Sequence, residues 1–199
     1  MAGLILLVSR AATAGTVWHV VSFSIYGSSL VALWSVSAVY HSFYHSKTTT
    51  VILKQLDHAM IYFLIAGTYT PVCLVVLRGA WGWSLFGTIW ALAVSGIILK
   101  LIFRFPPKRI IAVFFAFYII MGWLIVIAWN PLLRVLPHDG VFWLVAGGVF
   151  YTVGAMILGW KRPHIMLGFG NHEVWHLFVL AGCSSHFWMM FRYVLYLNL

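Results

Sequence analysis

The chain has 199 residues, of which 63% are hydrophobic and only 8% are charged. A soluble domain of this length cannot cover so much apolar surface with so few charges, so we predict that lipid is its solvent. The formal net charge is +9, but the basic residues are scattered through short predicted loops. This pattern indicates membrane topology rather than a nucleic-acid surface, and no nucleic-acid partner is expected.

Charged residues, prolines and glycines divide the chain into six apolar segments, each close to the ~20 residues that cross a bilayer. The segments are 18–44, 56–77, 80–99, 110–129, 140–160 and 172–196. Residues 1–9 form a further apolar stretch, which we interpret as the remnant of a first helix. We expect Pro71 to kink the second of the six segments, because proline removes a backbone hydrogen bond. The sequence therefore predicts a single all-α membrane domain over 1–199, a seven-helix bundle with a truncated first helix.

The distribution of basic residues predicts the orientation. With the remnant counted as the first helix, the loops after the second, fourth and sixth helices hold eight lysines and arginines, and the other loops hold three. The eight are Lys47, Lys54, Lys100, Arg104, Lys108, Arg109, Lys161 and Arg162; the three are Arg10, Arg78 and Arg134. Because cytoplasmic loops are enriched in basic residues, we expect a cytoplasmic N-terminus and an external C-terminus.

Ionisable side chains inside the apolar segments mark a candidate site, because such groups are costly in a bilayer and usually functional. The only carboxylates are Asp57, Asp139 and Glu173, and two of them, Asp57 and Glu173, adjoin histidines inside apolar segments. Asp57 is expected near the start of the third helix. His41 ends the second helix, and His172 and Glu173 begin the seventh. In the predicted orientation all these groups lie at the cytoplasmic end of the bundle.

These side chains have the chemistry of a zinc site. His172 and His176 are four residues apart, so they share one helix face and can chelate one ion. His41 would supply a third nitrogen. Asp57 could hold the water on the metal or orient a ligand, and Ser37, one turn before His41, could donate a hydrogen bond to substrate or to that water. Hydrogen bonding between helices is the alternative, but three clusters at one depth favour a metal.

The segment His172-Glu-x-x-His176 also matches the H-E-x-x-H motif of zinc proteases, in which Glu173 would be the general base. Such enzymes take a third ligand downstream. No Asp or Glu follows Glu173, and His186 does not fall where the extended metzincin pattern needs a histidine. Asp139 is predicted at the opposite face of the membrane. We therefore disfavour a protease.

The other histidines are weaker candidates. His45 repeats the four-residue spacing after His41 and is a rival ligand. His58 adjoins Asp57 but is expected to face about 100° away from it on a helix. His186 is predicted to have a packing role. Three further histidines near predicted loops are expected to be solvated: His19, His138 and His164.

Three motifs in this order carry a family resemblance: Ser37-x-x-x-His41, Leu56-Asp57-His58 leading into Ile65-Ala-Gly-Thr-Tyr-Thr-Pro71, and His172-Glu-x-x-His176 followed by His186-Phe187. With them the chain, from about Gly3 onward, resembles the hemolysin III proteins, within the wider group of progestin and adipoQ receptors. The resemblance implies seven helices of the adiponectin-receptor type with a cytoplasmic N-terminus.

The resemblance also implies a site. In the adiponectin-receptor branch, histidines matching His41, His172 and His176 hold zinc near the inner leaflet. An aspartate matching Asp57 contacts the water on that zinc, and a serine matching Ser37 belongs to the shared pattern. That branch and its alkaline ceramidase relatives imply zinc-dependent hydrolysis of a lipid amide.

The bacterial branch, named for haemolysis and linked to membrane homeostasis, implies residence in the cytoplasmic (inner) membrane. Its members usually begin with a fuller first helix. The shorter start of this chain is expected either to leave a groove beside the bundle or to reflect a start that is not the native one.

Three functions remain open, all with membrane lipids as partners. The first is a zinc-dependent hydrolase whose substrate is a lipid amide. The second is a non-enzymatic protein that regulates membrane or lipid homeostasis and uses zinc structurally. The third is a cytolysin, which we disfavour because a chain this apolar cannot diffuse through water to a target cell. The oligomeric state is left open.

Overall fold

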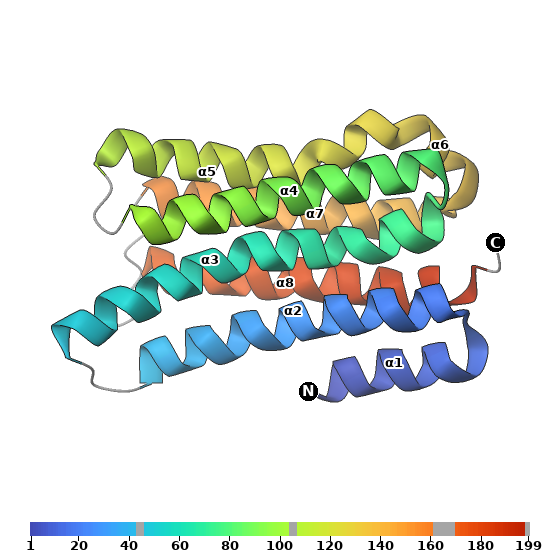
Figure 1. The fold of residues 1–199 in the computed structure, drawn as a ribbon, viewed down its shortest axis with the longest axis horizontal. Helices are drawn as coiled ribbons and strands as arrows, with labels where there is room; N and C mark the ends of the chain where they lie inside the picture. Colours follow the sequence, from blue (N-terminus) through green and yellow to red (C-terminus); the bar gives the residue numbers. More distant parts are fainter. Residues whose placement is uncertain (43–45, 104–106, 161–169, 198–199) are drawn as a thin grey trace.

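The computed structural model describes residues 1–42, 46–103, 107–160 and 170–197 (Figure 1). Within these ranges the regular structure is entirely helical. Six helices are long and apolar enough to cross a membrane, and one shorter apolar helix precedes them. The predicted all-α membrane bundle is thus confirmed. The elements are α1 (Ala2–Ala14), α2 (Val17–Ser42), α3 (Lys47–Pro71), η1 (Val72–Val76), α4 (Ala80–Ile102), α5 (Lys108–Trp123), η2 (Leu124–Ala128), α6 (Trp129–Val135), α7 (His138–Trp160), α8 (Asn171–Arg192) and η3 (Val194–Tyr196).

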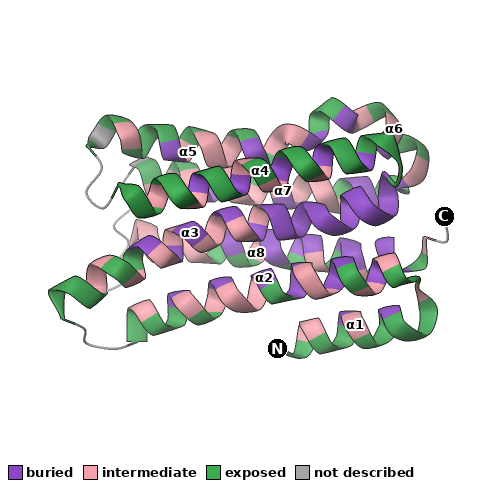
Figure 2. Cartoon of the chain, viewed as in Figure 1, coloured by how far each residue is buried: buried purple, intermediate pink, exposed green. Residues whose placement is uncertain are grey.

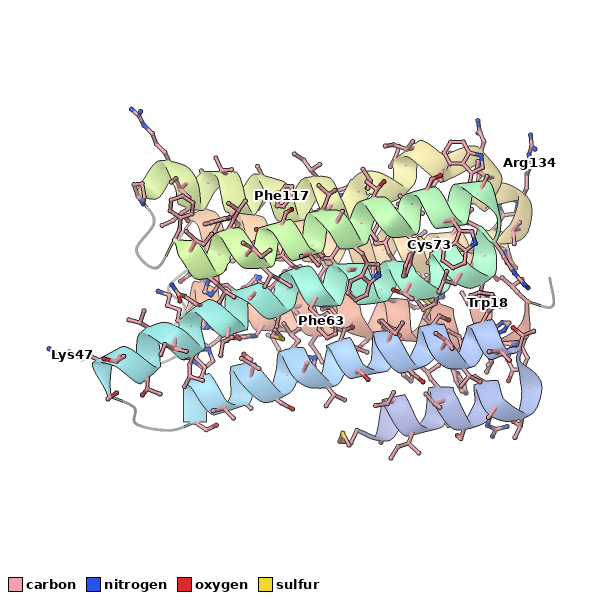
Figure 3. All side chains as sticks on the ribbon, in the orientation of Figure 1. Trp18, Lys47, Phe63, Cys73, Phe117 and Arg134 are labelled. Atoms are coloured by element: carbon pink, nitrogen blue, oxygen red, sulfur yellow. The ribbon has the colours of Figure 1, made fainter. Side chains whose placement is uncertain are left out.

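Helix α3 is the centre of the bundle and packs against α2 and α4, while α7 packs against α8 (Figure 1). Burial is continuous from Ala66 in the second half of α3 through η1 to Leu77, the purple stretch in Figure 2. The short helix α1 lies against α2 and covers only the half that begins at Val17 (Figure 1). Lys47 marks one end of the bundle, and Trp18 and Arg134 mark the opposite end (Figure 3).

Helix α3 begins nine residues earlier than the predicted segment 56–77, at Lys47 rather than at residue 56. The Ser46 hydroxyl oxygen accepts a hydrogen bond from the Thr49 backbone N–H at 3.2 Å, which caps the helix there. The first two and a half turns of α3 precede the apolar segment and are largely polar, so the apolar pattern did not predict them as part of the helix. As a consequence Asp57 lies nearly three turns into α3, not near its start as predicted.

The predicted segment 110–129 is interrupted and longer than expected, because α5 passes through the 3₁₀ turn η2 into α6. The Tyr69 hydroxyl of α3 occupies this interruption. It donates to the Gly122 carbonyl at 2.9 Å and accepts from the Ile125 backbone N–H at 2.9 Å. An intruding side chain of this kind is a known cause of a break in a helix.

Pro71 is the last α-helical residue of α3, and the chain continues as the π-helical turn η1, closed by a Leu77 N–H to Val72 carbonyl bond of 2.8 Å. The missing proline N–H explains the change of hydrogen-bond register. Thr68 and Thr70 donate their hydroxyls to carbonyls one turn earlier, at 2.8 Å each.

Two glycines let helices approach closely beside the interior of the bundle. A Cβ on Gly67 of α3 would collide with the Ser29 side chain of α2, and a Cβ on Gly147 of α7 would collide with the His186 ring of α8. Small residues at such contacts are typical of membrane helix packing. They bring α2 against α3 and α8 against α7, and so set the positions of the histidine-bearing helices.

The prediction that His19 is solvated is wrong, because its ring is only 2% exposed. Nδ1 accepts from the Thr16 backbone N–H at 3.0 Å, so Nε2 donates to the Val194 carbonyl at 3.1 Å. His19 therefore joins the start of α2 to η3. His138 is exposed, as expected, and His164 lies outside the described residues.

Candidate metal centre

Three histidine rings from two helices converge at one end of the bundle. His41 lies near the end of α2, and His172 and His176 occupy the first two turns of α8. The His172 Nε2 atom is 3.2 Å from His41 Nε2 and 3.1 Å from His176 Nε2. A ligand atom from each of the three lies within 4.8 Å of the others. The structure thus brings together residues that are 131 positions apart.

The donor set suits a cation. Each neutral imidazole carries one N–H and one lone pair, so hydrogen bonds among three rings leave at least one nitrogen poorly satisfied. A metal ion accepts the lone pairs of all three rings at once. His172 and His176 are half-buried and His41 is exposed. The group could hold a metal ion, with its open side toward His41.

A capping interaction at the start of α8 stabilises the helical turn that carries His172. The Glu173 carboxylate accepts a hydrogen bond from the Gly170 backbone N–H at 2.7 Å. A carboxylate in the first turn of a helix stabilises it by satisfying a free N–H and by its favourable interaction with the helix dipole. Glu173 is therefore engaged with its own backbone, which gives it a capping role and removes support for a protease-like general base.

Aromatic rings line the histidine cluster. The Tyr40 ring centroid is 4.5 Å from that of His41, and the Trp175 centroid is 4.6 Å from that of His176. Trp34 of α2 approaches His176 at 6.2 Å. These rings restrict the imidazole rotamers, so the convergence of the nitrogens is pre-organised by packing.

Asp57 and Ser37 face the cavity that the three histidines also line. Asp57 is only 4% exposed and Ser37 only 5%. The Asp57 carboxylate is close enough to His172 and His176 to interact with both electrostatically. Among the described residues it has no hydrogen bond or ion pair. A buried carboxylate without a partner is costly, so this group is poised to act on something in the cavity.

The cavity behind the histidines has a volume of about 550 Å³ and is walled by α2, α3, α5, α7 and α8. Its lining is mostly apolar and aromatic, and it reaches His186 on α8, ten residues beyond His176. At 1.5 Å rise per residue this is a depth of about 15 Å. The His186 Nε2 atom donates to the Leu144 carbonyl at 3.1 Å, and the Nδ1 atom of the same ring is buried without a hydrogen-bond partner among the described residues.

Three residues that were not predicted to belong to the site also line the cavity: Lys54, His58 and Tyr118. His58 was expected to face away from Asp57. The two side chains do diverge along α3, but the cavity is wide enough to take both. Tyr118 lies on α5 and carries no sequence signal that links it to the site. The rival ligand His45 lies outside the described residues.

A family model described as "Haemolysin-III related" matches residues 1–187 of this chain. The chain belongs to this family. It is 45% identical over 192 residues to "Hemolysin-3" of Bacillus cereus, an alignment that covers 96% of this chain and 84% of the relative. It is 40% identical over 190 residues to "Hemolysin-3 homolog" of Bacillus subtilis (strain 168), with 96% and 85% covered. The similarity extends to the human "Monocyte to macrophage differentiation factor", at 29% identity over 184 residues, 89% of this chain and 72% of the relative. This haemolysin-III chain is accordingly an integral membrane protein.

Proposed function

We propose that this protein is a zinc-dependent hydrolase of a lipid amide, acting at the inner leaflet. The observation that carries the proposal is Asp57, a buried carboxylate that makes no hydrogen bond or ion pair among the described residues. It lies at the polar end of an apolar cavity whose lining includes three convergent histidines. A zinc-dependent hydrolase of a lipid amide needs this combination of a base, a metal-binding group and a place for an acyl chain.

Zinc fits the histidine group. Zn–N bonds of about 2.0–2.1 Å in a tetrahedral arrangement place ligand nitrogens about 3.4 Å apart. The Nε2 separations of 3.1 Å and 3.2 Å are close to this value. Three protein ligands are typical of catalytic zinc sites, which keep one further position for water or substrate. His41, His172 and His176 would hold the ion.

Bound zinc would act as a Lewis acid, polarising a carbonyl oxygen and lowering the pKa of water. The Asp57 carboxylate would take a proton from the water that attacks the amide carbon, and would return it to the leaving nitrogen as the C–N bond breaks. The Ser37 hydroxyl lines the same cavity and would donate a hydrogen bond to the substrate carbonyl oxygen. The products would be a fatty acid and an amine.

The experiment replaces Asp57 with Asn, which is nearly isosteric but cannot accept the proton. Zinc-loaded wild-type protein should release fatty acid from a short-chain ceramide. Asp57→Asn should keep zinc and fold, and its turnover should fall by about 10²–10⁴-fold. Asp139→Asn is the matched control, because Asp139 is exposed at the start of α7, and it should keep wild-type turnover. Absence of release by the zinc-loaded wild type would reject the hydrolase.

A structural role for zinc is the second candidate, favoured by the origin of its ligands. His41 comes from α2, and His172 and His176 come from α8, so the ion would clamp two helices. In that case Asp57→Asn should have no phenotype in cells, and the protein would regulate membrane or lipid homeostasis without turnover. The relatives' name, Hemolysin-3, suggests cytolysis, but no feature of the cavity favours it.

A further inference from the structure

Two lysines lie close together at the end of the bundle that carries the histidine group. Lys54 of α3 is exposed and also lines the cavity, and Lys100 is half-buried in the last turn of α4. The two side chains are close enough to interact electrostatically with each other and with the His58 ring. Two positive charges from neighbouring helices therefore meet beside the opening of the cavity.

Lys100 is held in this position by an aromatic ring. Its Nζ atom lies 4.8 Å from the centroid of the Phe114 ring of α5, and Phe114 is itself buried. A cation over a ring face is attracted by the ring quadrupole, so the ammonium group does not simply turn away from Lys54. Neither lysine makes a side-chain hydrogen bond or an ion pair within the described part of the chain. Their N–H donors are thus available to an external acceptor.

The chain has no carboxylate to spare for this pair. Its acidic side chains number three, and Asp139 lies at the opposite end of the bundle, at the start of α7 (Figure 1). Glu173 caps α8, and Asp57 interacts with His172 and His176. The terminal carboxylate follows η3, which packs against the start of α2 at the far end. Because like charges repel one another unless an opposite charge is near, the counter-charge has to come from outside the chain.

The depth and the surroundings of the pair select the anion. Lys100 is at the end of a helix long enough to cross the membrane, which is the depth of the lipid phosphates. The oxygens of one phosphate can accept hydrogen bonds from two lysines at once. Large apolar side chains are exposed on α4 and α5 near this end and suit acyl chains. They include Ile98, Leu101, Ile102, Ile111 and Val113.

We propose that Lys54 and Lys100 form a binding site for the phosphate group of an anionic phospholipid, between α3 and α4 beside the opening of the cavity. The lipid supplies the negative charge that the chain lacks there, and its phosphate joins the two helices. Its acyl chains lie along the apolar outer faces of α4 and α5. The site contains none of the three histidines and does not include Asp57, so it is independent of the proposed hydrolase function.

Two double variants separate this site from general attraction between a basic surface and an anionic lipid. Lys54→Gln/Lys100→Gln removes both charges of the pair. The control, Lys47→Gln/Arg109→Gln, removes two charges from the same end of the bundle. Lys47 and Arg109 are exposed in the first turns of α3 and α5, and neither is a recorded electrostatic neighbour of Lys100. General attraction would weaken equally in the two variants, whereas a specific site is lost only in the first.

The test titrates the purified full chain in a neutral detergent at constant ionic strength. The probes are a short-chain phosphatidylglycerol, inorganic phosphate, and a phosphatidylcholine with the same acyl chains, whose ammonium group cancels its phosphate charge. The wild type should prefer the phosphatidylglycerol to the phosphatidylcholine by about 30-fold, since one lysine near an anionic lipid contributes about 5-fold. Lys54→Gln/Lys100→Gln should bind both lipids equally, and the control variant should keep most of the preference.

Inorganic phosphate should bind more weakly than the phosphatidylglycerol, because it makes no apolar contacts with α4 and α5. Equal or tighter binding of inorganic phosphate would overturn the lipid as the source of the phosphate group. A wild type without a preference between the two lipids, or a preference that survives in Lys54→Gln/Lys100→Gln, would overturn the site itself. An equal loss in Lys47→Gln/Arg109→Gln would also overturn it, since general surface attraction would then explain the binding.

Discussion

At the scale of single residues, the site contrasts two carboxylates. Asp57 is buried without a partner among the residues described, whereas Glu173 is satisfied by the Gly170 N–H. We therefore expect the carboxylate in the more recognisable motif to be structural, and the aspartate on another helix is the catalytic candidate. The reason is geometric, because Glu173 is in the first turn of α8, where free backbone donors attract it.

Metal binding is the first residue-scale prediction. Wild-type protein should contain about one zinc ion per chain by elemental analysis, and the double variant His172→Ala/His176→Ala should contain almost none. Two of three nitrogens are lost, and His41 alone is a weak ligand. His138→Ala is the control, since His138 is exposed at the start of α7. Equal zinc in wild type and the double variant would show that the cluster is not the metal site.

The second residue-scale prediction concerns Glu173. Gln also caps a helix, so Glu173→Gln should keep zinc content and turnover close to wild type. Glu173→Ala removes the acceptor for the Gly170 N–H and should lower stability by about 1 kcal/mol, measured as a lower melting temperature in detergent. A loss of turnover in Glu173→Gln with zinc still bound would restore the protease-like mechanism.

At the scale of helices, the site depends on which ends meet. The end of α2 and the start of α8 lie together beside a small apolar cluster, in which Leu33 of α2 and Leu64 of α3 pack with Val179 and Cys183 of α8. Lys47 and Lys54 of α3 lie in the same region as these ends, since α3 follows α2 directly. Basic residues thus accompany the candidate metal centre.

We predict from this arrangement that the metal centre faces the cytoplasm and that the C-terminus is external. Cytoplasmic ends of membrane helices are enriched in lysine and arginine. An alkaline phosphatase fused after Leu199, which is active only outside the cytoplasm, should be active in a bacterial host. Activity of a cytoplasm-specific reporter at the same position would reverse the orientation.

At the scale of the whole molecule, the cavity is enclosed by five helices, and the histidine group joins two of them, α2 and α8, at its polar end. An interior space of about 550 Å³ reduces packing between those helices, because empty volume costs dispersion contacts. A metal across the open end would compensate by holding α2 and α8 together.

The resulting prediction is a metal-dependent stability. A chelator should lower the melting temperature of the wild type by several degrees or more, since bound zinc stabilises the folded state only. The double variant His172→Ala/His176→Ala should melt at the lower temperature with or without chelator. A chelator that leaves wild-type melting unchanged would mean that the histidine group contributes no clamp between α2 and α8.

The sequence by itself determined that the protein is embedded in lipid, how many long helices it has and which histidines come together. Apolar runs of bilayer length are a local property, so all six long helices were predicted, and the spacing of His172 and His176 placed both on one helix face. The ends of the helices were predicted less well. Lys47–Gln55 carries no continuous apolar signal, and its helix depends on the Ser46 cap and on packing.

Only the tertiary structure decided what each side chain faces. His19 was expected in water and is buried against Val194, because η3 folds back onto the start of α2. His58 was expected to face away from Asp57, and a cavity wide enough for both brings it to the site. Burial and cavity shape depend on contacts between helices distant in sequence, and helical periodicity gives the direction of a side chain but not what lies there.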